Sequence, residues 1–159
     1  NNAAHQATFE SIEDISAEEW DVTFRTNIYS QFYLCKAAIP TMKPGSAIVN
    51  TTSINAKNPS PTLLAYATTK GAIANFTAGL AQLLGDKGIR VNAIAPGFFE
   101  SEMTDTYQPG YLDSQMPRVL LGRTGHGEEL AATAIWLSSA AAGYVTGQTL
   151  PVDGGITVT

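Results

Sequence analysis

The stretch IRVNAIAPG, residues 89–97, decides the fold, because it joins a mostly apolar run to an abrupt stop at Pro96-Gly97. A short apolar run bounded by turn residues is typical of a buried β-strand. Upstream of it, a helix is expected from near Pro61 to about Gly85. Before that helix, residues 47–49 form another short apolar run with a β-branched bias, and the polar residues 50–53 follow at once. We therefore expect a second buried strand whose C-terminal end turns polar.

A first helix and a final helix–strand pair are expected on either side of this centre. Residues 16–19 (SAEE) form a capping-box pattern that opens a helix. Beyond the centre, a third helix fits residues 128–139 and a last strand fits residues 148–152. Helices that alternate with buried strands indicate an α/β fold with a parallel sheet, in which ligands bind outside the carboxyl ends of the strands. Ser53 and Pro96-Gly97 both fall at such ends, which is the first functional hint.

Two of the expected helices carry apolar residues at helical spacing. In the first helix the residues expected in the core are Trp20, Phe24, Ile28, Phe32, Cys35 and Ile39. The helix near 61–85 has two apolar stripes, which are Tyr66, Ile73, Leu80 and Leu84 on one side and Ala72, Phe76, Gly79 and Leu83 on the other. A helix that is apolar on two sides must be covered on two sides. We expect a sheet on one side and a partner subunit on the other.

Composition narrows the classes of protein. The chain has 159 residues, 44% of them apolar and 14% charged, with a net charge of −5. This length suits one domain. The low charged fraction predicts surface that is buried against other subunits, and a chain cut out of a larger domain would show the same composition. No Lys/Arg cluster supports binding to nucleic acid or to an anionic membrane. No apolar run is long enough to cross a bilayer, and the single cysteine, Cys35, suits a reducing compartment. We therefore expect a cytoplasmic protein.

Tyr66 and Lys70 lie four residues apart in YATTK, and hence on the same face of the predicted helix. A free phenol has a pKa of about 10, which suits proton transfer at neutral pH poorly. A nearby lysine charge favours the phenolate and lowers this pKa, so the pair could act as a general acid or base. Ser53 could hydrogen-bond the same substrate oxygen. The alternative for an isolated pair of this kind is an ordinary helix face whose lysine reaches solvent.

Asn27 is a second unusual residue, because it lies in the middle of the first predicted helix. Asparagine is a poor helix former there, since its amide competes for backbone hydrogen bonds. It is either a tolerated exposed residue or the mark of a local distortion with a purpose. His5 and His126 have no partner pattern, and no cluster of residues has metal-ligand spacing, so no metal site is expected.

Several motifs occur together in one order: NNAA at residues 1–4, TNIYS around Asn27, NTTSINA around Ser53, YATTK, the Pro-Gly pair, and a closing helix and strand. In this combination the chain resembles the short-chain dehydrogenase/reductase family over nearly its whole length. The resemblance implies a Rossmann-like, doubly wound parallel sheet that is incomplete here. The family's glycine-rich turn and first strands would precede residue 1. Residues 1–159 would then be the C-terminal portion of a single oxidoreductase domain.

The resemblance also implies a reaction, in which NAD or NADP exchanges a hydride with a small ketone, aldehyde or alcohol. Tyr66 would be the general acid or base and Ser53 would polarise the substrate oxygen. Lys70 would lower the tyrosine pKa and bind the ribose hydroxyls, while Asn27 would anchor a proton-relay water through its main chain. The implied cofactor-binding residues are Asn2, Ala3, Ala4, Tyr66, Lys70, Pro96, Gly97, Phe99 and Ser101. A homodimer or homotetramer would form through the helix near 61–85.

The chain departs from the family pattern in three ways. Ala4 replaces the usual glycine, and Ser101 stands where a threonine usually contacts the carboxamide. The glycine-rich loop, whose amides would seat the pyrophosphate at a helix N-terminus, is absent from the sequence. The alternative is therefore a catalytically inactive fragment that serves only as an assembly or interaction module. The segment 98–125 is expected to line a substrate pocket with Phe99, Met103, Tyr107, Tyr111, Leu112 and Met116.

Overall fold

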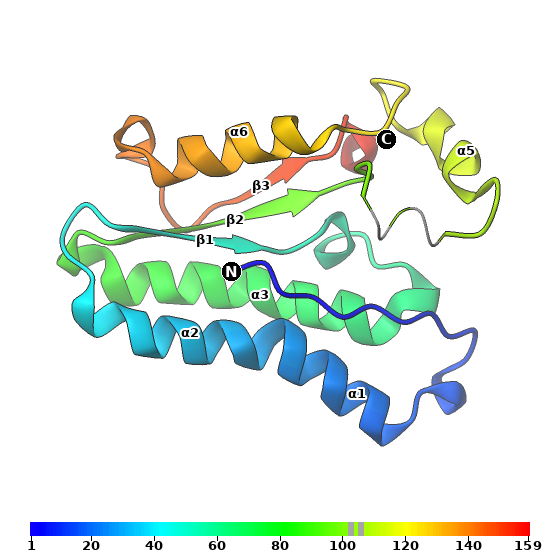
Figure 1. The fold of residues 1–159 in the computed structure, drawn as a ribbon, viewed down its shortest axis with the longest axis horizontal. Helices are drawn as coiled ribbons and strands as arrows, with labels where there is room; N and C mark the ends of the chain where they lie inside the picture. Colours follow the sequence, from blue (N-terminus) through cyan, green and yellow to red (C-terminus); the bar gives the residue numbers. More distant parts are fainter. Residues whose placement is uncertain (102–103, 105–106) are drawn as a thin grey trace.

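A computed structural model of the chain describes residues 1–101, 104 and 107–159. Met103, expected in the substrate pocket, lies outside the described residues. The strands β1 (Ala47–Thr51), β2 (Arg90–Pro96) and β3 (Thr149–Val152) form a parallel sheet in the order β1-β2-β3 (Figure 1). All three lie where the sequence predicted strands. The expected α/β fold with a parallel sheet is confirmed.

The helices also follow the prediction, with one interruption. A π-helical turn, Arg25–Tyr29, separates α1 (Ala17–Phe24) from α2 (Ser30–Ala38). Three further helices are α3 (Leu64–Leu84), the short α5 (Tyr111–Gln115) and α6 (Gly127–Ser138). Single 3₁₀ turns occupy Ile12–Asp14, Ile39–Thr41, Ile54–Ala56, Pro61–Leu63, Gly85–Lys87, Met116–Arg118, Ala140–Ala142 and Ile156–Val158.

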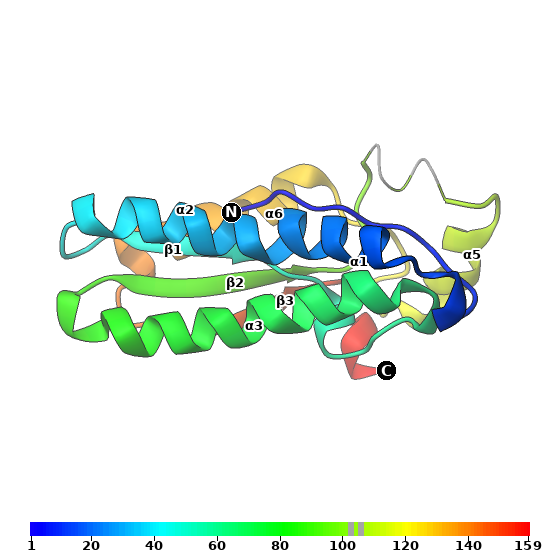
Figure 2. The same ribbon diagram turned by 90° about the horizontal axis from the view of Figure 1, so that it is seen from below.

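The sheet is covered on both faces. In Figure 1, α1, α2 and α3 lie below the strands and α6 lies above them, while Figure 2 shows α1 and α2 running beside α3. The first stripe of α3 is buried, as predicted, with Tyr66, Ile73, Leu80 and Leu84 in the interior. The second stripe is less uniform. Phe76 packs partly against the core cluster, whereas Leu83 is 72% exposed.

The prediction of core residues in the first helix holds only in part. Cys35 is buried and Ile39 packs against the core cluster, as predicted, whereas Trp20 and Phe32 are 36% and 46% exposed. The buried side chains that were not predicted are Thr23, Asn27 and Gln31. The buried residues follow one another every four positions from Thr23 to Cys35, a spacing that stays on one face when the helix widens at the π-helical turn. A polar stripe therefore faces α3. Asn27 marks a local distortion, which was one of its two sequence interpretations.

The N-terminal cap of α1 follows only half of the expected capping box. The Ser16 hydroxyl accepts a hydrogen bond from the Glu19 amide at 3.0 Å, as in an ordinary N-cap. The Glu19 carboxylate does not return to Ser16. It lies 2.8 Å from His5 Nε2 and accepts a hydrogen bond from the Thr23 hydroxyl, so it fastens the N-terminal segment to α1.

The N-terminal segment starts beside β1, at the outer edge of the sheet, and runs along α1 and the π-helical turn (Figures 1 and 2). The Asn1 amine donates to the Val49 carbonyl at 3.0 Å, and the Asn1 carbonyl accepts from the Thr51 amide at 2.9 Å. Further along, the Phe9 amide donates to the Thr62 carbonyl, just before α3 begins. Residues 1–9 are thereby held against both β1 and the start of α3.

The carboxyl ends of the three strands meet at one edge of the sheet. Ser53 follows β1, Gly97 follows β2 and Asp153 follows β3. Gly97 lies so close to β3 that an added Cβ would stand 2.8 Å from the Asp153 Cα, which explains the glycine there. This edge is the place where a parallel sheet positions a functional site.

In the described part of the chain, no helix has the length and hydropathy needed to cross a membrane. Across the same residues, His, Cys, Asp and Glu side chains form no group of three that could hold a metal ion.

Candidate functional site

Ser53 is placed by the turn that leaves β1. It is the N-cap of the 3₁₀ turn Ile54–Ala56, and its hydroxyl accepts hydrogen bonds from the Asn55 amide and from Asn55 Nδ2. The Asn55 side chain also accepts from the Ser60 amide, which closes the loop between β1 and α3. Ser53 is therefore a buried hydroxyl held in a fixed orientation beside the start of α3.

Lys70 and the end of β1 hold each other by two hydrogen bonds that run in opposite directions. The Thr52 hydroxyl donates to the Lys70 carbonyl at 2.6 Å, and Lys70 Nζ donates to the Thr51 carbonyl at 3.1 Å. Lys70 Nζ lies 5.3 Å from the centroid of the Tyr66 ring. The structure thus brings Ser53, Tyr66 and Lys70 together at the carboxyl end of β1, with Ser53 close enough to the Tyr66 hydroxyl to lower its pKa.

The electrostatics of this trio differ from the expectation. Burial raises the pKa of Tyr66, the hydrogen bond with Ser53 opposes this rise, and the nearby phenol of Tyr107 adds to it. The expected lowering of the Tyr66 pKa by Lys70 is therefore not found. Lys70 is itself only 1% exposed, and burial lowers its pKa to about 8. Desolvation thus dominates both groups and favours the neutral form of each.

Asn27 connects three parts of the chain beside the trio. Its Oδ1 accepts from the His5 amide at 2.6 Å, and its Nδ2 donates to the His5 carbonyl at 2.9 Å and to the Thr69 hydroxyl at 3.0 Å. Thr69 in turn donates to the Tyr66 carbonyl. The contacts therefore give the Asn27 side chain a positioning role. Its expected main-chain contact with a relay water remains a prediction.

The residues expected to bind a cofactor lie on both sides of this edge. Asn2, Ala3 and Ala4 are exposed on the N-terminal segment, and Pro96 and Gly97 end β2, where the Gly97 amide donates to the Val152 carbonyl at 2.9 Å. The main chain of Phe99 pairs with Gly125. Ser101 is exposed, and its hydroxyl is engaged within its own turn, with Thr104 and the Phe99 carbonyl.

Sequence reasoning missed a pair that joins the N-terminal segment to the segment after β2. The side chain of Gln6 lies close enough to the Tyr107 hydroxyl to oppose the rise in its pKa that burial causes. The Tyr107 ring contacts Tyr111 edge-on at 5.4 Å between centroids, and Tyr111 contacts Phe98 at 6.2 Å. Tyr107 was expected to line the substrate pocket, but no local signal pointed to Gln6 as its partner, because the two residues meet only through the fold.

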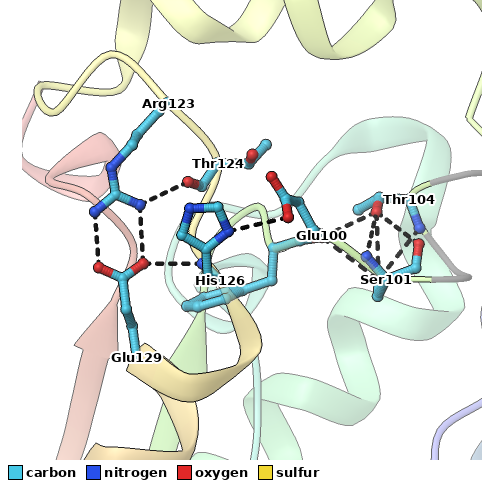
Figure 3. A network of polar contacts seen from close by, with 8 residues as sticks. Glu100, Ser101, Thr104, Arg123, Thr124, His126 and Glu129 are labelled. Carbon is cyan, nitrogen blue, oxygen red and sulfur yellow. Dashed lines mark hydrogen bonds and ion pairs between the residues drawn. The ribbon is translucent and has the colours of Figure 1, made fainter.

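A second polar network fixes the base of the segment that carries Tyr107 (Figure 3). Arg123 forms two hydrogen bonds with the Glu129 carboxylate, and this contact holds the pKa of Glu129 at about 2. The imidazole of His126 lies 3.0 Å from the Glu100 carboxylate. Sequence reasoning assigned Glu129 only a favourable place in the first turn of a helix. The sequence did not predict the ion pair of Glu129 with Arg123 or the contact of His126 with Glu100.

A small cavity of about 100 Å³ lies beneath this network. Its lining includes the rings of Phe98 and Phe99, the Arg123–Glu129 pair and Gly154. An added Cβ on Gly125 would stand 2.5 Å from the Phe99 ring, so this corner has no spare room. The cavity is not lined by Ser53, Tyr66 or Lys70, and the candidate site stays with that trio.

The comparisons with known proteins agree with this arrangement. A family model described as enoyl-(acyl carrier protein) reductase matches residues 1–157. An uncharacterized oxidoreductase of Schizosaccharomyces pombe is 47% identical over 158 residues, which is 99% of this chain and 55% of that protein. General stress protein 39 of Bacillus subtilis is 48% identical over 160 residues, which is 100% of this chain and 56% of that protein.

Among solved structures, a gluconate 5-dehydrogenase from Burkholderia cenocepacia in complex with NADP and tartrate superimposes with a TM-score of 0.94 at 34% identity. That match covers 99% of this chain and 63% of the other. The chain belongs to the short-chain dehydrogenase/reductase family, and its sheet is of the Rossmann-like kind. It spans about half the length of the curated relatives it matches.

Proposed function

We propose that this chain is the C-terminal portion of a single-domain NAD(P)-dependent oxidoreductase that interconverts a ketone or aldehyde and an alcohol. The observation that carries the proposal is the buried trio at the carboxyl end of β1, in which Tyr66 lies near Ser53 and beside Lys70. The family assignment supports it, as does the NADP complex of the gluconate 5-dehydrogenase.

The three side chains would divide the work on a substrate oxygen. The raised pKa of Tyr66 keeps its phenol protonated at neutral pH, so Tyr66 is ready to donate a proton to a carbonyl oxygen. Ser53 would hold and polarise the same oxygen. In the oxidising direction, Tyr66 would have to accept the proton, and a positive charge on Lys70 would then stabilise the phenolate.

The residues present fit a nicotinamide cofactor, which when bound supplies or accepts the hydride. Among the described residues, the Lys70 ammonium has a single acceptor, the Thr51 carbonyl, although it carries three N–H groups. The remaining N–H groups suit ribose hydroxyls. The exposed residues Asn2, Ala3 and Ala4 would contact the cofactor from one side, and Pro96, Gly97, Phe99 and Ser101 from the other. Either NAD or NADP satisfies these contacts.

The substitution Tyr66→Phe tests the proposal in the longer protein that contains this chain. It should remove nearly all turnover, because the proton donor is lost, while cofactor affinity measured by fluorescence titration should stay within about threefold of wild type. Tyr144→Phe makes the same chemical change at a fully exposed position and should alter neither quantity. Wild-type turnover in Tyr66→Phe would exclude Tyr66 as the proton donor and sink the proposal.

We further propose assembly of the whole protein into a homodimer or homotetramer through α3. Leu83 is an apolar side chain on α3 that is 72% exposed, which supports this helix as the contact. A cytoplasmic location is proposed as well, supported by the single cysteine. The alternative of an inactive interaction module gains no support from the comparisons.

A further inference from the structure

Thr52 connects three elements of the structure immediately before Ser53. Its amide donates a hydrogen bond to the Ile94 carbonyl of β2 at 2.8 Å, which fixes the main chain where β1 ends. Its hydroxyl donates to the Lys70 carbonyl of α3 at 2.6 Å. The place of α3 on the end of β1 is therefore tied to the sheet through the Thr52 side chain.

The hydroxyl bond of Thr52 is shielded from water, and the helix does not need it in order to form. Thr52 and Lys70 are each 1% exposed, so solvent does not replace the bond when it is lost. Within a helix such as α3, the Lys70 carbonyl already accepts the amide four residues later. A carbonyl oxygen has two lone pairs, and Thr52 uses the second. The bond therefore determines where α3 lies more than whether it forms.

The end of β1 holds Lys70 at both its main chain and its ammonium. Nζ donates to the Thr51 carbonyl at 3.1 Å, while Thr52 holds the Lys70 carbonyl. Nζ also lies 5.3 Å from the centroid of the Tyr66 ring. A shift of α3 along the strand would move Tyr66 and Lys70 together relative to Ser53, which follows the strand. A displacement of about 1 Å can cost on the order of a hundredfold in rate.

We propose that Thr52 is a positioning residue, whose hydroxyl places Tyr66 and Lys70 for the reaction at the end of β1. This inference rests on the function proposed above and adds a residue that would touch neither substrate nor cofactor. A threonine that served stability alone could be replaced by an apolar side chain of the same shape. A positioning threonine could not be replaced in this way without a loss of turnover.

Thr52→Val tests the inference in the longer protein, because it keeps the shape of the side chain and removes the hydroxyl. With NADPH or NADH and propanal as the probe, kcat should fall about tenfold to a hundredfold while KM stays within about threefold. Thr52→Ser keeps the hydroxyl and should retain most of the turnover. Thr77→Val is the matched control, because it removes another buried hydroxyl of α3, one bonded to Asn50 of β1 at 2.9 Å. It should leave kcat within about threefold of wild type.

A measurement without substrate separates this inference from the proposed function. Burial lowers the pKa of Lys70 to about 8. A ¹³C NMR titration of labelled lysine, assigned with Lys70→Met, follows this group directly. Thr52→Val should raise the Lys70 pKa by about 0.5 or more, because a displaced ammonium gains solvent. Thr52→Ser and Thr77→Val should leave it unchanged.

Three results would overturn the role of Thr52. The first is either wild-type kcat or an unchanged Lys70 pKa in Thr52→Val. The others are losses in Thr52→Ser as large as in Thr52→Val, and equal losses in Thr77→Val. Should urea unfolding show that Thr52→Val does not fold, Thr52→Ala also lacks the hydroxyl and must show the same two changes.

Failure of the proposed function looks different. Unchanged turnover in Tyr66→Phe contradicts the oxidoreductase proposal, whatever Thr52→Val does. If the wild type does not reduce propanal, the NMR titration alone decides whether Thr52 holds Lys70 in place.

Discussion

Burial controls the two ionisable residues at the centre of the candidate site. It raises the pKa of Tyr66 and lowers the pKa of Lys70 to about 8. Both shifts favour the neutral form, because a charge inside the protein has lost the solvation that it has in water. Burying the charged form of Lys70 therefore lowers the free energy of unfolding. A buried apolar side chain at this position would not carry this cost.

The cost at Lys70 predicts a dependence of stability on pH. Below about pH 8 the lysine is charged in both states and its burial destabilises the fold. Between about pH 8 and the unfolded pKa of 10.5 the unfolded chain binds more protons, so stability rises with pH. Relative to Lys70→Met, the wild-type free energy of unfolding should rise by on the order of 2 kcal/mol from pH 7.5 to 10.

Urea denaturation without added nucleotide measures this difference at the two pH values. The comparison with Lys70→Met isolates the lysine from other titrating groups. Above pH 10 the raised pKa of Tyr66 acts with the opposite sign in both proteins and should cancel in the difference. Parallel pH profiles for the two proteins would show that the ammonium is already well solvated.

The sequence predicted correctly that Ser53, Tyr66 and Lys70 lie together, but it predicted their surroundings poorly. Ser53, Tyr66 and Lys70 were found because strand ends and a four-residue helical spacing are local patterns. The Gln6–Tyr107 pair and the Glu100–His126 contact join residues that are distant in sequence, so no local pattern could reveal them. The Tyr66 pKa was misjudged because burial, unlike spacing, cannot be read from the sequence.

At the scale of elements, the π-helical turn at Arg25–Tyr29 explains both a success and an error. Their helical spacing predicted that Trp20, Phe24 and Phe32 would lie together on the face of a regular helix that enters the core. The turn instead directs Asn27 into the interior, where it binds the N-terminal segment and α3. A local distortion was foreseen at Asn27, but its effect on the aromatic residues was not.

Asn27→Ala should therefore destabilise the protein more than a surface substitution can. It removes three hydrogen bonds and leaves the His5 amide and carbonyl without their partner, so the free energy of unfolding should fall by about 2–4 kcal/mol. Asn75→Ala is the control, an exposed asparagine within α3, and should change stability by less than about 1 kcal/mol. Thermal and urea unfolding of both variants check this. Equal losses would remove the special role of Asn27.

For the molecule as a whole, the sequence correctly indicated the parallel sheet and the two layers of helices, because alternating apolar runs record which elements are buried. The low charged fraction and the second stripe of α3 also predicted an assembly surface. Exposed apolar residues on α2 and α3 support this prediction.

Leu83→Glu tests the assembly surface. A carboxylate at this 72% exposed position should cost little within one subunit but should oppose burial against a partner, so the variant should shift toward monomer. Ile12→Glu places the same charge at a similarly exposed apolar residue, 68% exposed, outside this face and should leave the assembly intact. Light scattering during gel filtration of the longer protein measures both. An unchanged mass for Leu83→Glu would exclude this face.

The reciprocal hydrogen bonds between Thr52, Thr51 and Lys70 have a consequence for how such a protein diversifies. They fasten Lys70, and with it the trio proposed to react, to the end of β1, so the geometry of the trio is set when the chain folds. The segment after β2 that carries Tyr107 takes no part in these hydrogen bonds. Substitutions in that segment would therefore leave them intact. New substrate specificities would then arise from substitutions in this segment alone, while the proposed reaction stays the same.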